Sequence, residues 1–192
     1  NNPLWPFTTR LAMPKVDLKS VPIVQRHINS LVLSTFLKKY YPEKIRALNS
    51  GWFFEQKDEQ SAVYAKLINW CKSSTLEQDN LQMGITALVR RSILFGVSVP
   101  RLISQVVEAL GNVAERWKKD FDILQVQLSL LKTDAGDSIP EKAINIQITR
   151  LRDEYLLSTL ASEGFLPGYG FPTDVVSFVT TTIEDLQRKS KE

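Results

Sequence analysis

The apolar residues of this 192-residue chain recur at spacings of three and four over most of its length, and this pattern predicts amphipathic α-helices. The longest such stretch covers residues 100–132. Its apolar positions are Leu102, Val106, Leu110, Val113, Trp117, Phe121, Leu124, Leu128 and Leu131. Because they advance by about 3.6 residues per step, they form one straight stripe along the helix.

A partner for this helix follows directly in the sequence. Pro140 opens a second periodic stretch at about 140–163, and only the polar turn cluster 133–138 separates the two. So short a connection makes the two helices antiparallel neighbours, and residues from about 100 to 163 are therefore predicted to form a long helical hairpin.

Four further helices are predicted, at 22–41, 58–73, 76–95 and 174–188. Residues 43–49 are expected to form a short helical turn that Ser50-Gly51 ends, and the aromatic run 52–54 is expected in the core. Gly96 is expected to stop the helix before it. The fold class is thus all-α, a helical bundle of about six helices with a long antiparallel hairpin and an extended N-terminal segment.

Prolines mark the start of the predicted domain. Residues 1–22 contain four prolines, which forbid a long helix and favour an extended arm or a linker. Residues 23–188 are expected to form a single helical domain, and residues 189–192 a frayed tail. The chain begins at Asn1 without methionine, as expected of a piece of a longer protein.

The first helix, 22–41, supplies several candidate functional residues. The candidates for its buried side are Val24, His27, Ile28, Leu31, Val32 and Phe36, with Ile23 and Leu37 at the margins. The residues predicted to face elsewhere are Gln25, Arg26, Asn29, Lys38 and Lys39. Pro22 suits the first turn of this helix, where its missing N–H costs nothing.

The loop 165–172, FLPGYGFP, is unusually apolar for a connection between helices. Gly164 suits the position just past a helix end, where positive φ is needed. Two interpretations stay open: a well-packed loop inside one domain, or a docking surface for another domain. Its candidate docking residues are Phe165, Leu166, Pro167, Tyr169, Phe171 and Pro172.

Positive charge is concentrated at the front of the chain. The whole chain carries a net charge of +3, but residues 1–50 carry +6 and the remainder −3. Such a basic front can bind phosphate backbones or an acidic partner, or can be a solvated face with no partner. The candidate nucleic-acid-binding residues are Arg26, Lys38, Lys39, Lys44 and Arg46.

Catalytic and metal chemistry find little support in the sequence. His27 is the only histidine and Cys71 the only cysteine, which excludes an internal disulfide and a Cys-based metal site, and favours a reducing cytoplasm. A Cys71–His27 pair is conceivable, but nothing in the surrounding residues supports it. No Walker-type loop is present, so this chain alone should not hydrolyse ATP. No apolar run approaches the length of a membrane span.

Three segments together resemble a known family. They are 22–37 (PIVQRHINSLVLSTFL), 51–54 (GWFF) and 160–178 (LASEGFLPGYGFPTDVVSF). They look like the region that follows the motor in large bacterial superfamily 2 DEAD/DEAH-type helicases, some of which belong to DISARM-like phage-defence systems or to DNA repair. Arg26, His27, Asn29 and residues 166–172 carry the likeness, and the middle of the chain, about 55–155, hardly matches.

This resemblance implies an ATP-dependent DNA motor as the parent protein. The ATP, Mg²⁺ and Zn²⁺ of such a parent would be bound outside this chain, which itself needs no cofactor. The chain would then link the motor to a cysteine-rich C-terminal module and contact DNA. His27 and Asn29, together with the loop residues above, would dock against the parent's other domains.

Two hypotheses for the function follow. The first is a non-catalytic helical accessory domain of a DNA helicase, with DNA and the parent's other domains as partners. The alternative is a helical protein–protein adaptor with no nucleic-acid role, which would use the apolar loop or the long hairpin. The oligomeric state stays open.

Overall fold

The computed structural model describes residues 19–44, 48–56, 61–73, 80–131 and 139–168, and this part is an all-α bundle with no strand. The helices are α2 (Val21–Tyr40), the 3₁₀ turn η1 (Pro42–Lys44), α3 (Ser50–Phe54), α4 (Val63–Lys72), α5 (Leu81–Val89), α6 (Val99–Leu131), α7 (Ile139–Asp153) and α8 (Leu156–Ser162). The proline-rich segment 1–18, the helix predicted at 174–188 and the tail 189–192 lie outside the described residues.

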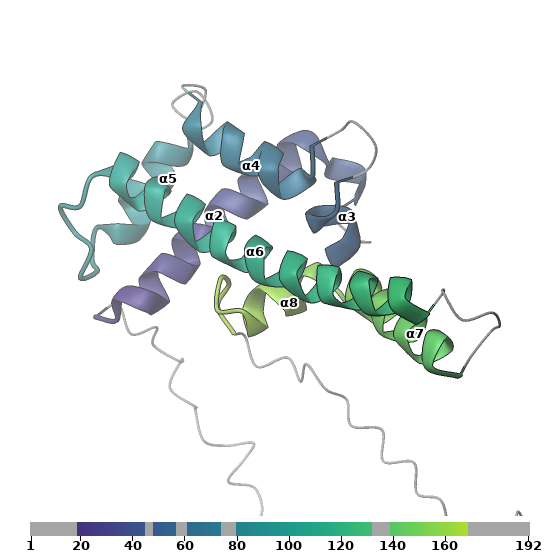
Figure 1. The fold of residues 1–192 in the computed structure, drawn as a ribbon. Coiled ribbons are helices and arrows are strands. Elements are labelled where there is room, and N and C mark those ends of the chain that lie inside the picture. The colour runs from purple at the N-terminus through teal and green to yellow at the C-terminus, as the bar shows by residue number, and fades with distance from the viewer. Residues whose placement is uncertain (1–18, 45–47, 57–60, 74–79, 132–138, 169–192) are drawn as a thin grey trace, which may run out of the picture.

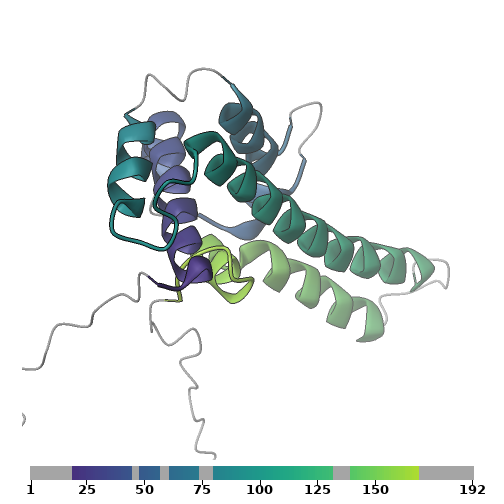
Figure 2. The ribbon, with the colours of Figure 1, turned by 90° about the vertical axis from the view of Figure 1, so that its left-hand side faces the viewer.

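Helix α6 packs against α2, α3, α4, α5 and α7, and its bounds match the prediction within one residue. Its first half crosses α2 and packs against α4 in the body of the domain (Figure 1). Most of the predicted stripe is buried, namely Leu102, Val106, Leu110, Val113, Trp117 and Leu128. Its second half runs beside α7, and the two helices leave the body as an antiparallel arm (Figure 2). The predicted hairpin is therefore confirmed over these two helices.

The buried side of α2 differs from the predicted one at four positions, and one of them is Leu31, which is half-buried. Asn29 is only 2% exposed, although its polar side chain was predicted to face elsewhere, and Leu33 is buried as well. The Asn29 amide is accommodated because Gln25 Nε2 donates to its Oδ1 at 3.0 Å and its own Nδ2 donates to the Phe165 carbonyl at 2.9 Å. His27, predicted on the buried side, is half-buried.

The prediction of one continuous helix over 140–163 is wrong, because the chain breaks between α7 and α8. At the break, Asn49 and Tyr155 form an isolated antiparallel β-bridge. The Ser50 N–H donates to the Glu154 carbonyl at 2.9 Å, and the Leu156 N–H donates to the Leu48 carbonyl at 3.1 Å. Backbone groups that a continuous helix would pair internally are thus paired with a distant segment. The hairpin consists of α6 and α7 alone.

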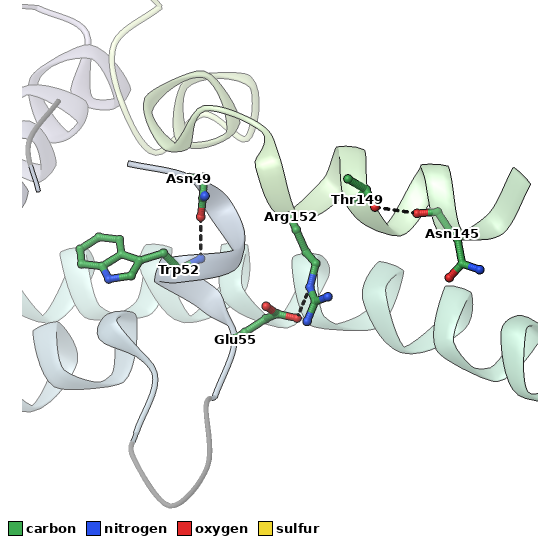
Figure 3. Close-up of polar contacts among 6 residues, drawn as sticks. All are labelled: Asn49, Trp52, Glu55, Asn145, Thr149 and Arg152. Carbon is green, nitrogen blue, oxygen red and sulfur yellow. Dashed lines mark hydrogen bonds and ion pairs between the residues drawn. The ribbon is translucent and has the colours of Figure 1, made fainter. Parts of the chain in front are cut away.

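The prediction that Ser50-Gly51 ends a helical turn is also wrong, because these two residues begin α3. Asn49 caps this helix: its Oδ1 accepts a hydrogen bond from the Trp52 N–H at 2.8 Å (Figure 3). The Ser50 hydroxyl lies 2.7 Å from that of Thr159 on α8, and both residues are buried. Of the predicted aromatic core run, Phe53 and Phe54 are buried and Trp52 is half-buried.

Of the glycines in the described ranges, two take the left-handed backbone conformation. Gly164, with φ of +75°, follows the end of α8, as predicted. Gly96, with φ of +85°, ends a series of turns instead of a helix, because α5 already stops at Val89. The helix predicted over 76–95 is therefore shorter at its C-terminal end.

Candidate nucleic-acid interface

Three predicted DNA-binding lysines lie together at the C-terminal end of α2. Lys38 and Lys39 occupy its last turn and Lys44 the 3₁₀ turn that follows, and all three are exposed. A helix C-terminus carries partial negative charge, so the first two lysines also stabilise the helix. Around the helix axis Lys38 lies about 160° from Tyr40, whereas Lys39 is adjacent to Tyr40.

The other two predicted DNA-binding residues do not join this cluster. Arg26 lies twelve residues before Lys38, which corresponds to about 18 Å along the helix. Its guanidinium lies against Gly164, where an added Cβ would come within 3.3 Å of Arg26 Nη2. Arg46 lies outside the described residues.

Beside Lys39 lies an aromatic groove between α2 and α4 that sequence reasoning missed. It is a cavity of about 330 Å³ lined by Phe36, Tyr40, Tyr41, Lys66, Asn69, Trp70 and Ser73. We call this site the aromatic groove. The two tyrosines directly after Lys38-Lys39 were a signal in the sequence, but the α4 residues join them only through the packing of the two helices.

The aromatic rings of the groove are in contact with one another. The Phe36 centroid lies 5.1 Å from that of Tyr40 and 5.6 Å from that of Trp70, and Tyr40 meets Trp70 edge-on at 6.4 Å. Lys39 Nζ lies 5.3 Å from the centre of the Tyr40 ring, within the range of a cation–π interaction. Phe36 and Trp70 are buried, while Tyr40 remains 46% exposed.

Positive charge prevails around the groove. Among the described residues that line it, none is a carboxylate. The segments 36–44 and 66–73 that form it contain five lysines and one glutamate, Glu43, which is exposed in the 3₁₀ turn. Such a surface attracts anionic ligands at a distance.

Some of the loop residues predicted to dock another domain are buried in the core of this chain. Phe165 is 1% exposed and Leu166 is buried too, and both belong to the hydrophobic core. Asn29 is buried against the Phe165 carbonyl, and Pro167 and His27 are half-buried. The described part of the loop thus corresponds to the well-packed alternative. Tyr169, Phe171 and Pro172 lie outside the described residues.

The two helices of the hairpin carry five large apolar side chains that are exposed. They are Ile123, Val126 and Leu130 on α6 and Ile139 and Ile146 on α7. We call these five residues the hairpin outer face. Large exposed apolar side chains that gather on one element are typical of a protein-binding surface.

Cys71 lacks the properties of a nucleophile. It is buried, and this burial raises the pKa of its thiol from 9.0 to about 12. The thiol therefore stays protonated at neutral pH. Within the described ranges, no three His, Cys, Asp or Glu side chains come together in an arrangement that could hold a metal ion.

None of the helices in the described part combines the length and the apolar character that crossing a membrane requires. Comparison with protein-family models, with curated proteins and with solved structures found no match for this chain.

Proposed function

We propose that this chain is a non-catalytic helical accessory domain of an ATP-dependent DNA helicase, which links the motor to the C-terminal module and contacts DNA. The resemblance of segments 22–37, 51–54 and 160–178 supports the helicase assignment. ATP, Mg²⁺ and Zn²⁺ would be bound by other parts of the parent. A cytoplasmic location fits the single reduced cysteine.

The observation that carries the DNA contact is the cluster of exposed lysines at the end of α2, with Lys66 of α4 beside it. Lysines neutralise phosphates and release condensed counterions, and this sequence-independent term supplies most of the affinity for a DNA backbone. The lysines stand on a helix end and a 3₁₀ turn that pack against the core through Phe36 and Leu37. This support holds the backbone that carries the lysines in place within the described domain.

The double substitution Lys38→Glu with Lys39→Glu tests the proposal. We expect it to weaken DNA binding about tenfold or more, equally for different sequences, and to reduce the salt slope of log K by about 2, because two phosphate contacts are lost. Fluorescence anisotropy with labelled DNA, between about 50 and about 200 mM salt, measures both quantities.

A matched control exists on α6. Lys118 and Lys119 are also adjacent and exposed, so Lys118→Glu with Lys119→Glu makes the same charge change elsewhere. If both double variants weaken binding equally, only net charge matters and the α2 lysines form no site. If the unaltered chain binds no DNA at low salt, the proposed DNA contact is refuted.

The hairpin outer face favours the second candidate function, a protein–protein adaptor. Its five apolar residues lie on an arm that leaves the body of the domain (Figure 2), where a partner helix can reach them. Because these side chains are exposed, they contribute little to the stability of the chain itself.

For the adaptor, we expect Val126→Lys with Leu130→Lys to abolish association while the melting temperature hardly changes. Light scattering over a wide range of concentrations detects self-association, and co-purification with the parent's remaining domains detects a docked neighbour. Lys118→Gln with Lys119→Gln, on the same helix, is the control. Unchanged association in the Val126 and Leu130 variant would exclude this face as the adaptor surface.

A further inference from the structure

The aromatic groove has features that phosphate binding alone does not require. A solvated basic patch needs no exposed ring, yet Tyr40 is 46% exposed, with the Lys39 ammonium over its ring and with the Phe36 and Trp70 rings in contact with it. Such contacts reduce the rotamer freedom of the tyrosine, so less entropy is lost when a ligand stacks on it.

The size and polarity of the groove suit a single planar ring system. Its volume of about 330 Å³ lies at the lower end of the range for small-ligand sites. The apolar part of the lining comes from aromatic rings of α2 and α4. The polar part includes Lys66, a cation for a phosphate, and Asn69, whose amide can both donate to and accept from the edge of a base.

The state of the nucleic acid decides whether such a groove can be used. In a duplex the faces of each base are covered by its neighbours, so a protein ring can stack only after the base is unstacked and unpaired at a cost in free energy. In a single strand the faces are accessible, and stacking on an aromatic side chain strengthens binding for every type of base.

From the exposed Tyr40 ring, the neighbouring lysines and the size of the groove, we infer that the aromatic groove binds one unpaired base of single-stranded DNA. Tyr40 is the stacking platform, and Lys39 and Lys66 hold the flanking phosphates. The inference rests on the proposed DNA contact and adds a specificity to it. The lysines would bind either form of DNA, whereas Tyr40 would favour the single strand.

The variant Tyr40→Leu separates the two contributions. Leucine keeps apolar bulk against Phe36 and Trp70 but has no ring face. With the full 192-residue chain and labelled oligothymidine, we expect about tenfold weaker single-strand binding, while binding to a duplex of equal length stays unchanged. Tyr155→Leu is the matched control, because Tyr155 is 47% exposed and does not line the groove.

A second measurement keeps the inference testable if Tyr40→Leu proves unstable in thermal melting. A single strand with 5-iododeoxyuridine, irradiated on the unaltered chain, should crosslink to Tyr40 or Tyr41, as identified by mass spectrometry. Two results would overturn the inference: crosslinks at residues other than Tyr40 and Tyr41, or an unchanged ratio of single-strand to duplex affinity in Tyr40→Leu. In both cases DNA still binds, so the proposed phosphate contact would be retained. If neither form of DNA binds, both proposals fail.

Discussion

Phe165→Ala is expected to lower the free energy of unfolding by about 3–5 kcal/mol, the usual cost of truncating a buried phenylalanine. The side chain is 1% exposed and packs in the same core as α2 and α8. Its own carbonyl accepts the amide hydrogen bond of Asn29 from 136 residues away in the sequence. The substitution would therefore leave a cavity where the segment around Phe165 is hydrogen-bonded to α2. Urea denaturation followed by circular dichroism measures the loss.

Leu130→Ala is the control for this experiment. Leu130 is 67% exposed, so its truncation should change stability by less than about 0.5 kcal/mol. If Phe165→Ala changed stability as little as the control, Phe165 would not be fixed in the core. That result would favour the docking interpretation of residues 165–172, which the buried position of Phe165 argues against.

The residues that the sequence placed correctly are those whose environment depends on local periodicity. The stripe from Leu102 to Leu128 on α6 could be predicted because one long helix buries the same face throughout, so spacing alone identifies the buried positions. The antiparallel partner could be predicted because a turn of a few residues leaves two helices no other packing.

The sequence-based predictions fail where a backbone or side-chain group forms its hydrogen bond with a segment far away in the sequence. Nothing near Tyr155 signals a helix end, since no glycine or proline follows within eight residues. The helix ends because the backbone of Leu48 and Ser50 pairs with that of Glu154 and Leu156. Asn29 illustrates the same limit: an asparagine on a helix is predicted to face water unless its buried partner, here the Phe165 carbonyl, is known.

The candidate site was predictable to a similar degree. Charge counting found Lys38, Lys39 and Lys44, because lysines near a helix end are exposed in almost any packing. It also included Arg26, which the length of α2 separates from the others. The groove itself could not be found, because Lys66 and Asn69 reach Tyr40 only when α4 packs beside α2.

Gly51→Ala is expected to destabilise the chain by about 1–2 kcal/mol, although alanine is the better helix former. A Cβ at this position would lie 3.1 Å from Arg152 Cβ and 3.2 Å from the Arg152 carbonyl oxygen. Arg152 cannot readily move aside. Its Nε donates to Glu55 Oε1 at 2.7 Å (Figure 3), and its guanidinium lies over the Phe121 ring at 5.4 Å. The clash therefore pushes α3 away from the break between α7 and α8.

Gly111→Ala is the matched substitution, with an expected effect of opposite sign. Gly111 lies within α6, and an added Cβ would have nothing within 4 Å. Alanine there should stabilise the chain by about 0.5–1 kcal/mol, because glycine loses more backbone entropy in a helix. Thermal melting of the two variants side by side should move the midpoint down for Gly51→Ala and up for Gly111→Ala. A rise in both would mean that α3 has room for a Cβ at position 51 against Arg152, and that the expected clash does not occur.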